Sequence, residues 1–265
     1  MKMPSQPALA GLHVAGAGAA TGPCRLLVRA SSPFSGEQQK MLYATVSTFG
    51  LAAARGAFGV SGSDPVRGTV ASAHYNAGDA EFECDLHTIE PRSLQVLRQM
   101  LTGLQTEGLD IVSVNVTGLA QPPHAALPST LAAFEDDEEA VYPGLVTGVP
   151  LLLPGDSDSF SVGSRLRRCE ITLVESVASR HLDAMRDIAD PWFTMLECGG
   201  YALPVEMPWV VNNVGGSINP FDTCSIELTV VRFDSSEQAW LALANMIHVA
   251  GPGLGLRALE IRVDD

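Results

Sequence analysis

Phe82-Glu-Cys-Asp-Leu-His-Thr88 and Cys224-Ser-Ile-Glu-Leu-Thr-Val230 are the stretches of sequence that decide the fold. In both, mostly apolar side chains alternate with polar ones, which is the period of a β-strand with one buried and one polar face. Antiparallel sheets covered on one side only have this pattern. The two stretches therefore predict an antiparallel sheet in each half of the chain.

The elements around these strands recur in the same order in both halves. An offset of 143 residues places Gly56 on Gly199, and with it three further identical pairs: Pro65 on Pro208, Asn76 on Asn219 and Asp79 on Asp222. Periodicity predicts strand, helix, strand, strand, helix, strand, at residues 25–30, 36–54, 57–60, 82–88, 94–104 and 111–116, and again at 169–174, 179–197, 201–203, 224–230, 239–250 and 258–263. Such repetition indicates an internal duplication.

The order βαββαβ is that of a ferredoxin-like unit, in which two helices cover one face of a four-stranded antiparallel sheet. The predicted class is therefore α+β. In topology alone, the pair of units resembles the α+β barrel superfamily, in which two ferredoxin-like units pack sheet against sheet. That resemblance implies a single-chain barrel. Polar side chains on the uncovered strand faces fit either a polar cavity between the sheets or two separate units with solvated sheets.

Local signals refine the expected elements. Gly56 and Gly199 follow the first helix of each half, where a left-handed residue ends a helix. Pro191 is expected to kink or restart the helix at 179–197, with Asp190 as a cap. Ser235 and Gln238 have the spacing of a capping box.

The chain is expected to divide into four parts: an N-terminal arm (1–23), a first repeat (24–118), a Pro-rich acidic linker (119–167) and a second repeat (168–265). The arm is too glycine-rich and too weakly apolar for a secretory signal. Within the linker, the acidic run at 135–139 reads as solvated. The apolar stretch at 148–154 could pack along a sheet edge.

The composition narrows the classes of function. Thirty acidic and 16 basic residues give a net charge of −14, which disfavours nucleic acid and favours a basic protein partner. No apolar run is long enough for a membrane span. The five cysteines include no C-x-x-C pair, so we expect neither disulfides nor zinc, and a cytoplasmic location. The scarcity of lysine relative to arginine indicates a GC-rich bacterial genome.

Candidate site residues come from the long connections at 61–78 and 204–221, and from the polar face of the strand at 82–88. Loops this long inside compact units are often functional. The candidates for ligand or partner binding are His74, Tyr75, Asn76, His87, Trp209, Asn212, Asn213 and Asn219. Trp209 is the aromatic anchor among them, while the Asn and Asp residues also suit ordinary turn geometry.

No nucleophile elbow, P-loop or H-E-x-x-H motif occurs, and no cofactor or metal is expected. The leading hypothesis is a non-catalytic protein that binds a protein partner through these loops or an exposed sheet face. The alternative is a small-molecule-binding protein or enzyme with a polar pocket between the sheets. There, His87 or His74 would act as acid or base. Whether the chain is an enzyme, its substrate or partner and its oligomeric state stay open, including a role as a subunit of a larger assembly.

Overall fold

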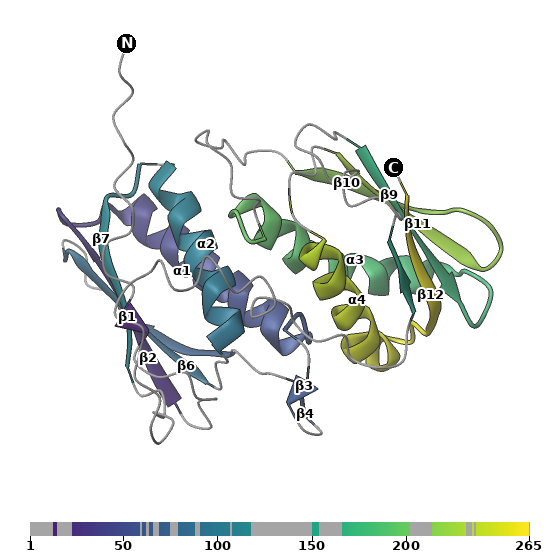
Figure 1. Ribbon diagram of the computed structural model, residues 1–265, viewed down its shortest axis with the longest axis horizontal. Helices are drawn as coiled ribbons and strands as arrows, with labels where there is room; N and C mark the ends of the chain where they lie inside the picture. Colours follow the sequence, from purple (N-terminus) through teal and green to yellow (C-terminus); the bar gives the residue numbers. More distant parts are fainter. Residues whose placement is uncertain are drawn as a thin grey trace, which may run out of the picture.

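The computed structural model describes residues 13–14, 23–58, 60–61, 64–65, 69–74, 79–87, 91–106, 108–117, 150–153, 166–201, 214–231, 235 and 237–264. Within these residues the chain is an α+β protein with four α-helices and a sheet in each half (Figure 1). The predicted fold class is confirmed at this level.

The first half contains two helices and a mostly antiparallel sheet. The helices are α1 (Gly36–Ala54) and α2 (Pro91–Thr106). The sheet has the order β1-β7-β2-β6-β5, formed by β1 (His13–Val14), β2 (Pro23–Ala30), β5 (Thr69–His74), β6 (Glu81–His87) and β7 (Ile111–Thr117). β1 runs parallel to β7 at one edge. A separate two-stranded ribbon is formed by β3 (Val60–Ser61) and β4 (Asp64–Pro65).

The second half has the same arrangement. Its helices are α3 (Ser179–Glu197) and α4 (Gln238–Ala250), followed by the 3₁₀ turn η4 (Pro252–Leu254). The sheet has the order β10-β11-β9-β12-β8, formed by β8 (Leu151–Leu152), β9 (Leu166–Leu173), β10 (Gly215–Pro220), β11 (Ser225–Val231) and β12 (Ala258–Asp264). β8 runs parallel to β12, as β1 does to β7.

Backbone hydrogen bonds outside the strands also recur between the halves. Among these bonds, Ala30 N to Ala80 O (2.9 Å) matches Leu173 N to Cys224 O (2.7 Å), and Phe34 N to Asp79 O (3.0 Å) matches Val177 N to Thr223 O (2.8 Å). Asp79 therefore corresponds to Thr223. The constant offset that set Asp79 on Asp222 is one residue out at this point of the chain.

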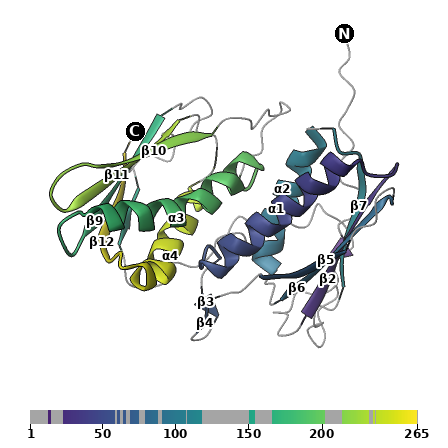
Figure 2. The same cartoon turned by 180° about the vertical axis from the view of Figure 1, so that it is seen from behind.

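The helices of the two halves pack against each other between the two sheets. In both views α1 and α2 face α3 and α4, and the sheets lie on the outside (Figures 1 and 2). The expectation of a barrel with its sheets face to face is therefore wrong: the described residues form no closed barrel. Buried apolar residues of both halves form one continuous core through the helical layer, with Trp192 and Trp240 packed at 5.1 Å between ring centroids.

The strands predicted at 82–88 and 224–230 correspond to β6 and β11. In β6, Phe82, Cys84 and Leu86 are buried, while Glu83 and Asp85 are partly exposed. In β11, the buried residues of the alternation are Ile226, Leu228 and Val230. These side chains face the helices, so the polar residues between them lie on the outer faces of the sheets.

Among the described residues of the predicted second strands, at 57–60 and 201–203, only Val60 lies in a strand, the short β3. Ala57 and Phe58 lie in a turn after α1, and Tyr201 lies in the equivalent turn after α3. The sheets instead contain β5 and β10, which occupy parts of the segments predicted as long connections, 61–78 and 204–221. The apolar residues of the turns resemble strands because they are buried, Ala57 at 0% and Tyr201 at 1% exposure.

The helix ends match some predictions and correct others. Gly56 and Gly199 have φ angles of +90° and +83°, which confirms the left-handed stops. α3 runs without interruption through Pro191 from Ser179 to Glu197, so the predicted restart at Asp190 is wrong. α4 begins at Gln238 with no side-chain cap bond, so Ser235 does not form the predicted capping box.

The apolar stretch at 148–154 does reach a sheet edge. Leu151 pairs with Ile261 and Leu152 with Arg262 in the β8–β12 ladder. Ile261 N also donates to Pro150 O at 2.9 Å. The rest of the predicted linker up to β9 lies outside the described residues, as does the N-terminal arm apart from β1 and Pro23, the first residue of β2.

Candidate functional site

The outer face of the second sheet carries two rows of polar residues that face away from the helices. The strand registers define them: the first row is Asn219, Glu227, Glu170 and Arg262, and the second is Ser217, Thr229, Arg168 and Asp264, on β10, β11, β9 and β12 in that order. All eight residues are exposed or partly exposed. We call this set the outer face of the second sheet.

Hydrogen bonds join some neighbours on this face. Asn219 Nδ2 donates to Ser217 Oγ at 3.1 Å, and Thr229 Oγ1 donates to Glu227 Oε1 at 3.2 Å. Arg262 pairs with Glu260 at 3.0 Å. Glu170 and Glu227 are directly opposite each other in the register, an arrangement that is unfavourable for like charges. The outer face is thus polar and charged, and it contains a local acidic pair.

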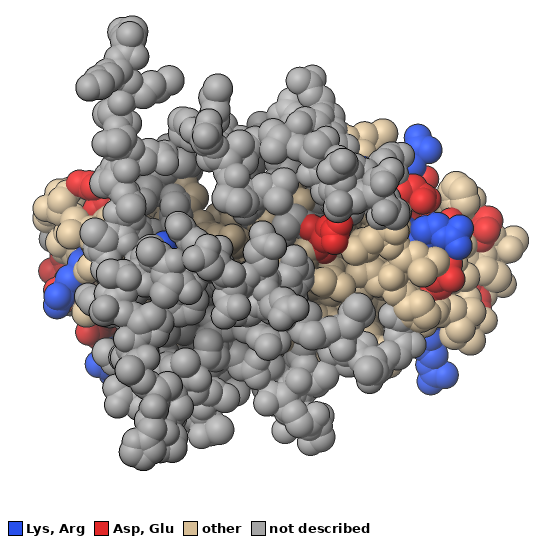
Figure 3. Space-filling view, in the orientation of Figure 1, with Lys and Arg blue, Asp and Glu red and all other residues tan. Residues whose placement is uncertain are grey.

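The first sheet presents a corresponding outer face with its charges paired. Arg25 contacts Asp85 at 3.2 Å and Glu83 at 3.7 Å, and Arg29 contacts Glu81 at 2.7 Å. Exposed pairs of this kind contribute about 0–1 kcal/mol each to stability. The described charged residues gather mainly at the two ends of the molecule, where the sheets lie (Figure 3). Both outer faces are therefore open, charged surfaces.

Of the eight predicted site residues the structure describes three, and these three do not lie together. In the backbone register His74 lies opposite Glu83, and His87 lies opposite Pro23 and Thr69, all in the first sheet. Asn219 lies on β10 of the second sheet, on the far side of the helical layer (Figure 2). The other five predicted residues lie outside the described part of the chain: Tyr75, Asn76, Trp209, Asn212 and Asn213.

Asp222 has the turn role that the sequence allowed for it. Its Oδ1 accepts hydrogen bonds from the backbone N–H groups of Cys224 and Ser225, both at 2.7 Å. The bond from Cys224 is the main reason why the pKa of this carboxyl lies below its usual range. Asp222 thus closes the turn between β10 and β11.

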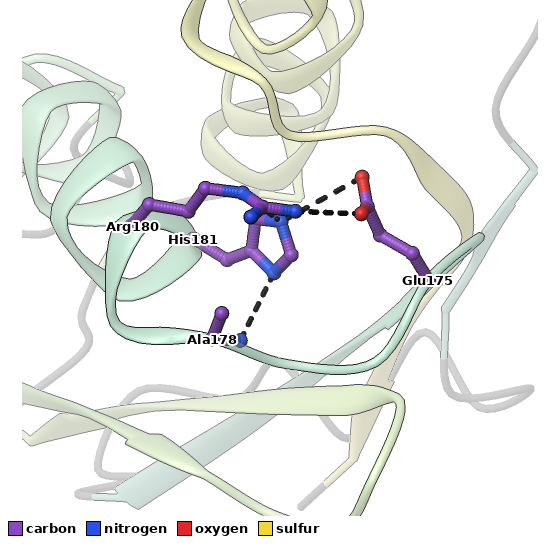
Figure 4. A network of polar contacts seen from close by, with 4 residues as sticks. All are labelled: Glu175, Ala178, Arg180 and His181. Carbon is purple, nitrogen blue, oxygen red and sulfur yellow. Dashed lines mark hydrogen bonds and ion pairs between the residues drawn. The ribbon is translucent and has the colours of Figure 1, made fainter.

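A polar cluster that the sequence argument missed lies at the start of α3 (Figure 4). His181 is fully buried, and its Nδ1 accepts a hydrogen bond from Ala178 N at 3.1 Å. Arg180 Nε lies 3.1 Å from His181 Nε2, and the Arg180 guanidinium pairs with Glu175 at 2.7 Å. Glu175 Oε1 is also 3.7 Å from His181 Nε2.

The geometry of His181 shows that the cluster is structural. A neutral imidazole has one N–H donor and one acceptor nitrogen, so it cannot accept from Ala178 and from Arg180 at once. Accepting from Ala178 leaves the proton on Nε2, which faces the Glu175 carboxylate. The ring thus satisfies a backbone N–H at the helix start, which is a structural role. The sequence signal that could have found this cluster is the offset of 143 residues, which places His181 on Gln38.

The remaining chemistry of the described residues is limited. They include no group of three or more His, Cys, Asp or Glu side chains that could hold a metal ion. Four described cysteines are free thiols, and burial raises the pKa of Cys169 and Cys198. Among the helices of the described part, none is both long and apolar enough to cross a membrane.

The sequence matches no protein-family model and no curated protein.

Proposed function

We propose that this chain is a non-catalytic binding protein that holds a protein partner on the outer face of its second sheet. The observation that carries the proposal is the pair of exposed polar rows on that face. Because the helices cover the inner face, the eight side chains of the rows all project from one side of a rigid sheet. Flat surfaces built on rigid strands suit a protein partner better than a small molecule, which needs a concave site.

The charge of the chain adds a preference for the partner. With a net charge of −14, the protein attracts a basic partner over several ångströms and speeds its association. The acidic pair Glu170 and Glu227 lies at the centre of the first row. Binding should therefore weaken as salt rises. Free thiols at the described cysteines agree with a cytoplasmic setting, which remains part of the proposal.

We also infer that the two halves are copies of one ferredoxin-like unit. Support comes from the shared order of the four main strands, from the matching backbone bonds and from α1 and α3, which are offset by the same 143 residues at both ends. The alternative function required a pocket between the sheets. The helices occupy that space, so no observation favours it.

Site-specific photo-crosslinking in the source cell tests the binding proposal. A photoreactive residue at Ser217 or Arg168 should give a discrete crosslinked product with a partner protein. The same residue at Tyr43, which is 48% exposed on α1, is the matched control on a helical surface. Equal crosslinking from all three positions, or from the control alone, would contradict the proposal.

A further inference from the structure

The helices of the first half meet those of the second half along one surface. Contacts on this surface occur twice, with the two halves exchanging roles. We call this surface the seam. Residues that make contacts across the seam are Thr45, Gly56, Ala57, Gln99 and Gly103 from the first half, and Cys198, Gly199, Tyr201, Asn245 and Val249 from the second.

The glycine after the first helix of each half packs closely on the second helix of the other half. A Cβ on Gly56 would lie 2.6 Å from Val249 Cβ on α4. In the reversed contact, Gly199 lies on α2, where a Cβ would be 3.5 Å from Gln99 O and 3.8 Å from Gly103 Cα. Gly56 and Gly199 are equivalent positions, so this is one contact made twice.

The backbone that follows each glycine is held by an amide side chain from the same opposing helix. Asn245 Nδ2 on α4 lies 3.5 Å from Ala57 O. Gln99 Oε1 on α2 accepts a hydrogen bond from Tyr201 N at 3.0 Å. Between these contacts α1 packs on α3, its own counterpart, where Thr45 Oγ1 and Cys198 Sγ are 3.8 Å apart.

In this pair of contacts, the end of the first helix of each half packs on the second helix of the other half. Such reciprocal contacts are the mark of a two-fold, isologous interface between copies of one unit. We propose that the seam is a self-complementary docking surface, and that a second copy of this chain can occupy it by exchanging halves. This inference rests on the inferred duplication and stands apart from the proposed binding function on the outer sheet faces.

The connection between the halves permits the exchange. Residues 118–149 separate the last residue of β7 from the segment that holds β8, a chain long enough to extend about 100 Å. Joining two units in one chain favours pairing within that chain, at effective concentrations of about a millimolar. Exchange between chains therefore becomes visible when pairing within the chain is blocked.

Complementation between two full-length variants tests the proposal. Gly103→Leu damages the seam surface of the first half only, and Val249→Arg damages that of the second half only. Each variant alone has no intact seam. In the mixture, the unaltered second half of one can pair with the unaltered first half of the other. Native mass spectrometry should show a heterodimer near twice 28.0 kDa, at least tenfold above either homodimer. No excess of heterodimer would overturn the proposal.

A second measurement covers the case in which either variant fails to fold. A protease site inserted after Ala126 in the otherwise unaltered chain allows the folded protein to be cut between its halves. The two pieces should stay together near 28 kDa in size exclusion and should exchange with isotopically labelled pieces. Separation of the pieces at micromolar concentration, or failure to exchange over days, would show that the seam is not an autonomous interface.

Discussion

Gln38 and His181 hold the same place in the two halves, and each accepts a hydrogen bond from the backbone N–H three residues before it. Ser35 N donates to Gln38 Oε1 at 2.9 Å, and Ala178 N donates to His181 Nδ1 at 3.1 Å. At the start of α1 the two residues form a reciprocal capping box, since Ser35 Oγ also accepts a hydrogen bond from Gln38 N at 3.2 Å. In α3 the alanine methyl has no acceptor, and His181 N donates instead to the backbone oxygen of Ala178 at 2.9 Å, so only half of the capping box is present.

Ala178→Ser should therefore stabilise the protein, because its hydroxyl would give the His181 N–H a side-chain acceptor like the one that Ser35 gives Gln38. The expected gain is about 1 kcal/mol in the free energy of unfolding, measured by urea denaturation. Ser35→Ala, which removes the same bond from α1, should cost about the same. A serine at 178 that leaves the unfolding midpoint unchanged would show that α3 does not need this cap.

Gly103→Ala should destabilise the protein although alanine is the better helix former. The gain in helix propensity is about 1 kcal/mol. Against it, the new Cβ would lie 2.5 Å from the backbone oxygen of Cys198, and overpacking of this kind costs about 1–3 kcal/mol. Since the obstacle is backbone at the seam, we expect a net loss of up to about 2 kcal/mol in the free energy of unfolding, measured by chemical denaturation.

Gly36→Ala is the matched control for that substitution. Gly36 is also helical, but a Cβ there meets nothing within 4 Å. The free energy of unfolding of the Gly36→Ala variant should equal that of the unaltered protein or exceed it by up to about 1 kcal/mol. Similar losses from both substitutions would contradict the close approach of α2 to the end of α3.

The carboxyl of Asp222 should titrate below the usual aspartate value of about 3.9. Because its pKa is lowered in the folded state, its contribution to stability is present above that usual value and is lost as the pH falls through the lower folded pKa. Carbon-detected NMR titration measures this directly. Asp222→Asn keeps an acceptor for the turn and should lose only the pH dependence. A normal Asp222 titration would show that the turn bonds do not favour the charged form.

Tyr201→Phe should leave stability unchanged or raise it by about 1 kcal/mol. Tyr201 is 1% exposed, and its hydroxyl has no hydrogen-bond partner among the described residues. Burial raises the pKa of this phenol. Phe58, at the equivalent position, packs on Phe49 without a hydroxyl. A loss of more than 1 kcal/mol in thermal unfolding would show that the hydroxyl is hydrogen-bonded in the native protein.

The sequence predicted the helices and the best strands because their signals are local. Both bounds of α1 and α3 follow from apolar periodicity and from the glycine stops at Gly56 and Gly199. The second strands were missed because β10 reads Gly-Gly-Ser-Ile-Asn-Pro, which has few strand-forming residues. The buried residues beside the glycines, Ala57 and Tyr201, looked like strands because the seam covers them.

The packing of the halves could not be read from sequence, because it depends on contacts far apart in the chain. The structure shows the effect of this packing in α1, which buries polar Gln39 and Thr45 as well as its apolar stripe. A helix buried on more than its sheet-facing side needs a second covering layer. Of the candidate site, Asn219 was predicted. The residues beside it on the outer face required the register of four strands, which periodicity alone does not give.

The most direct test of this arrangement is a disulfide between α1 and the end of α3. Thr45 Oγ1 lies 3.8 Å from Cys198 Sγ in the seam, close enough for a cysteine at position 45 to pair with Cys198 after a small adjustment. Thr45→Cys under mild oxidation should give the 45–198 crosslink by peptide mapping. Thr229→Cys, on the outer face, should give no crosslink to Cys198. Absence of the 45–198 bond in folded protein, or equal crosslinking from position 229, would contradict a molecule with its helices inside and its sheets outside.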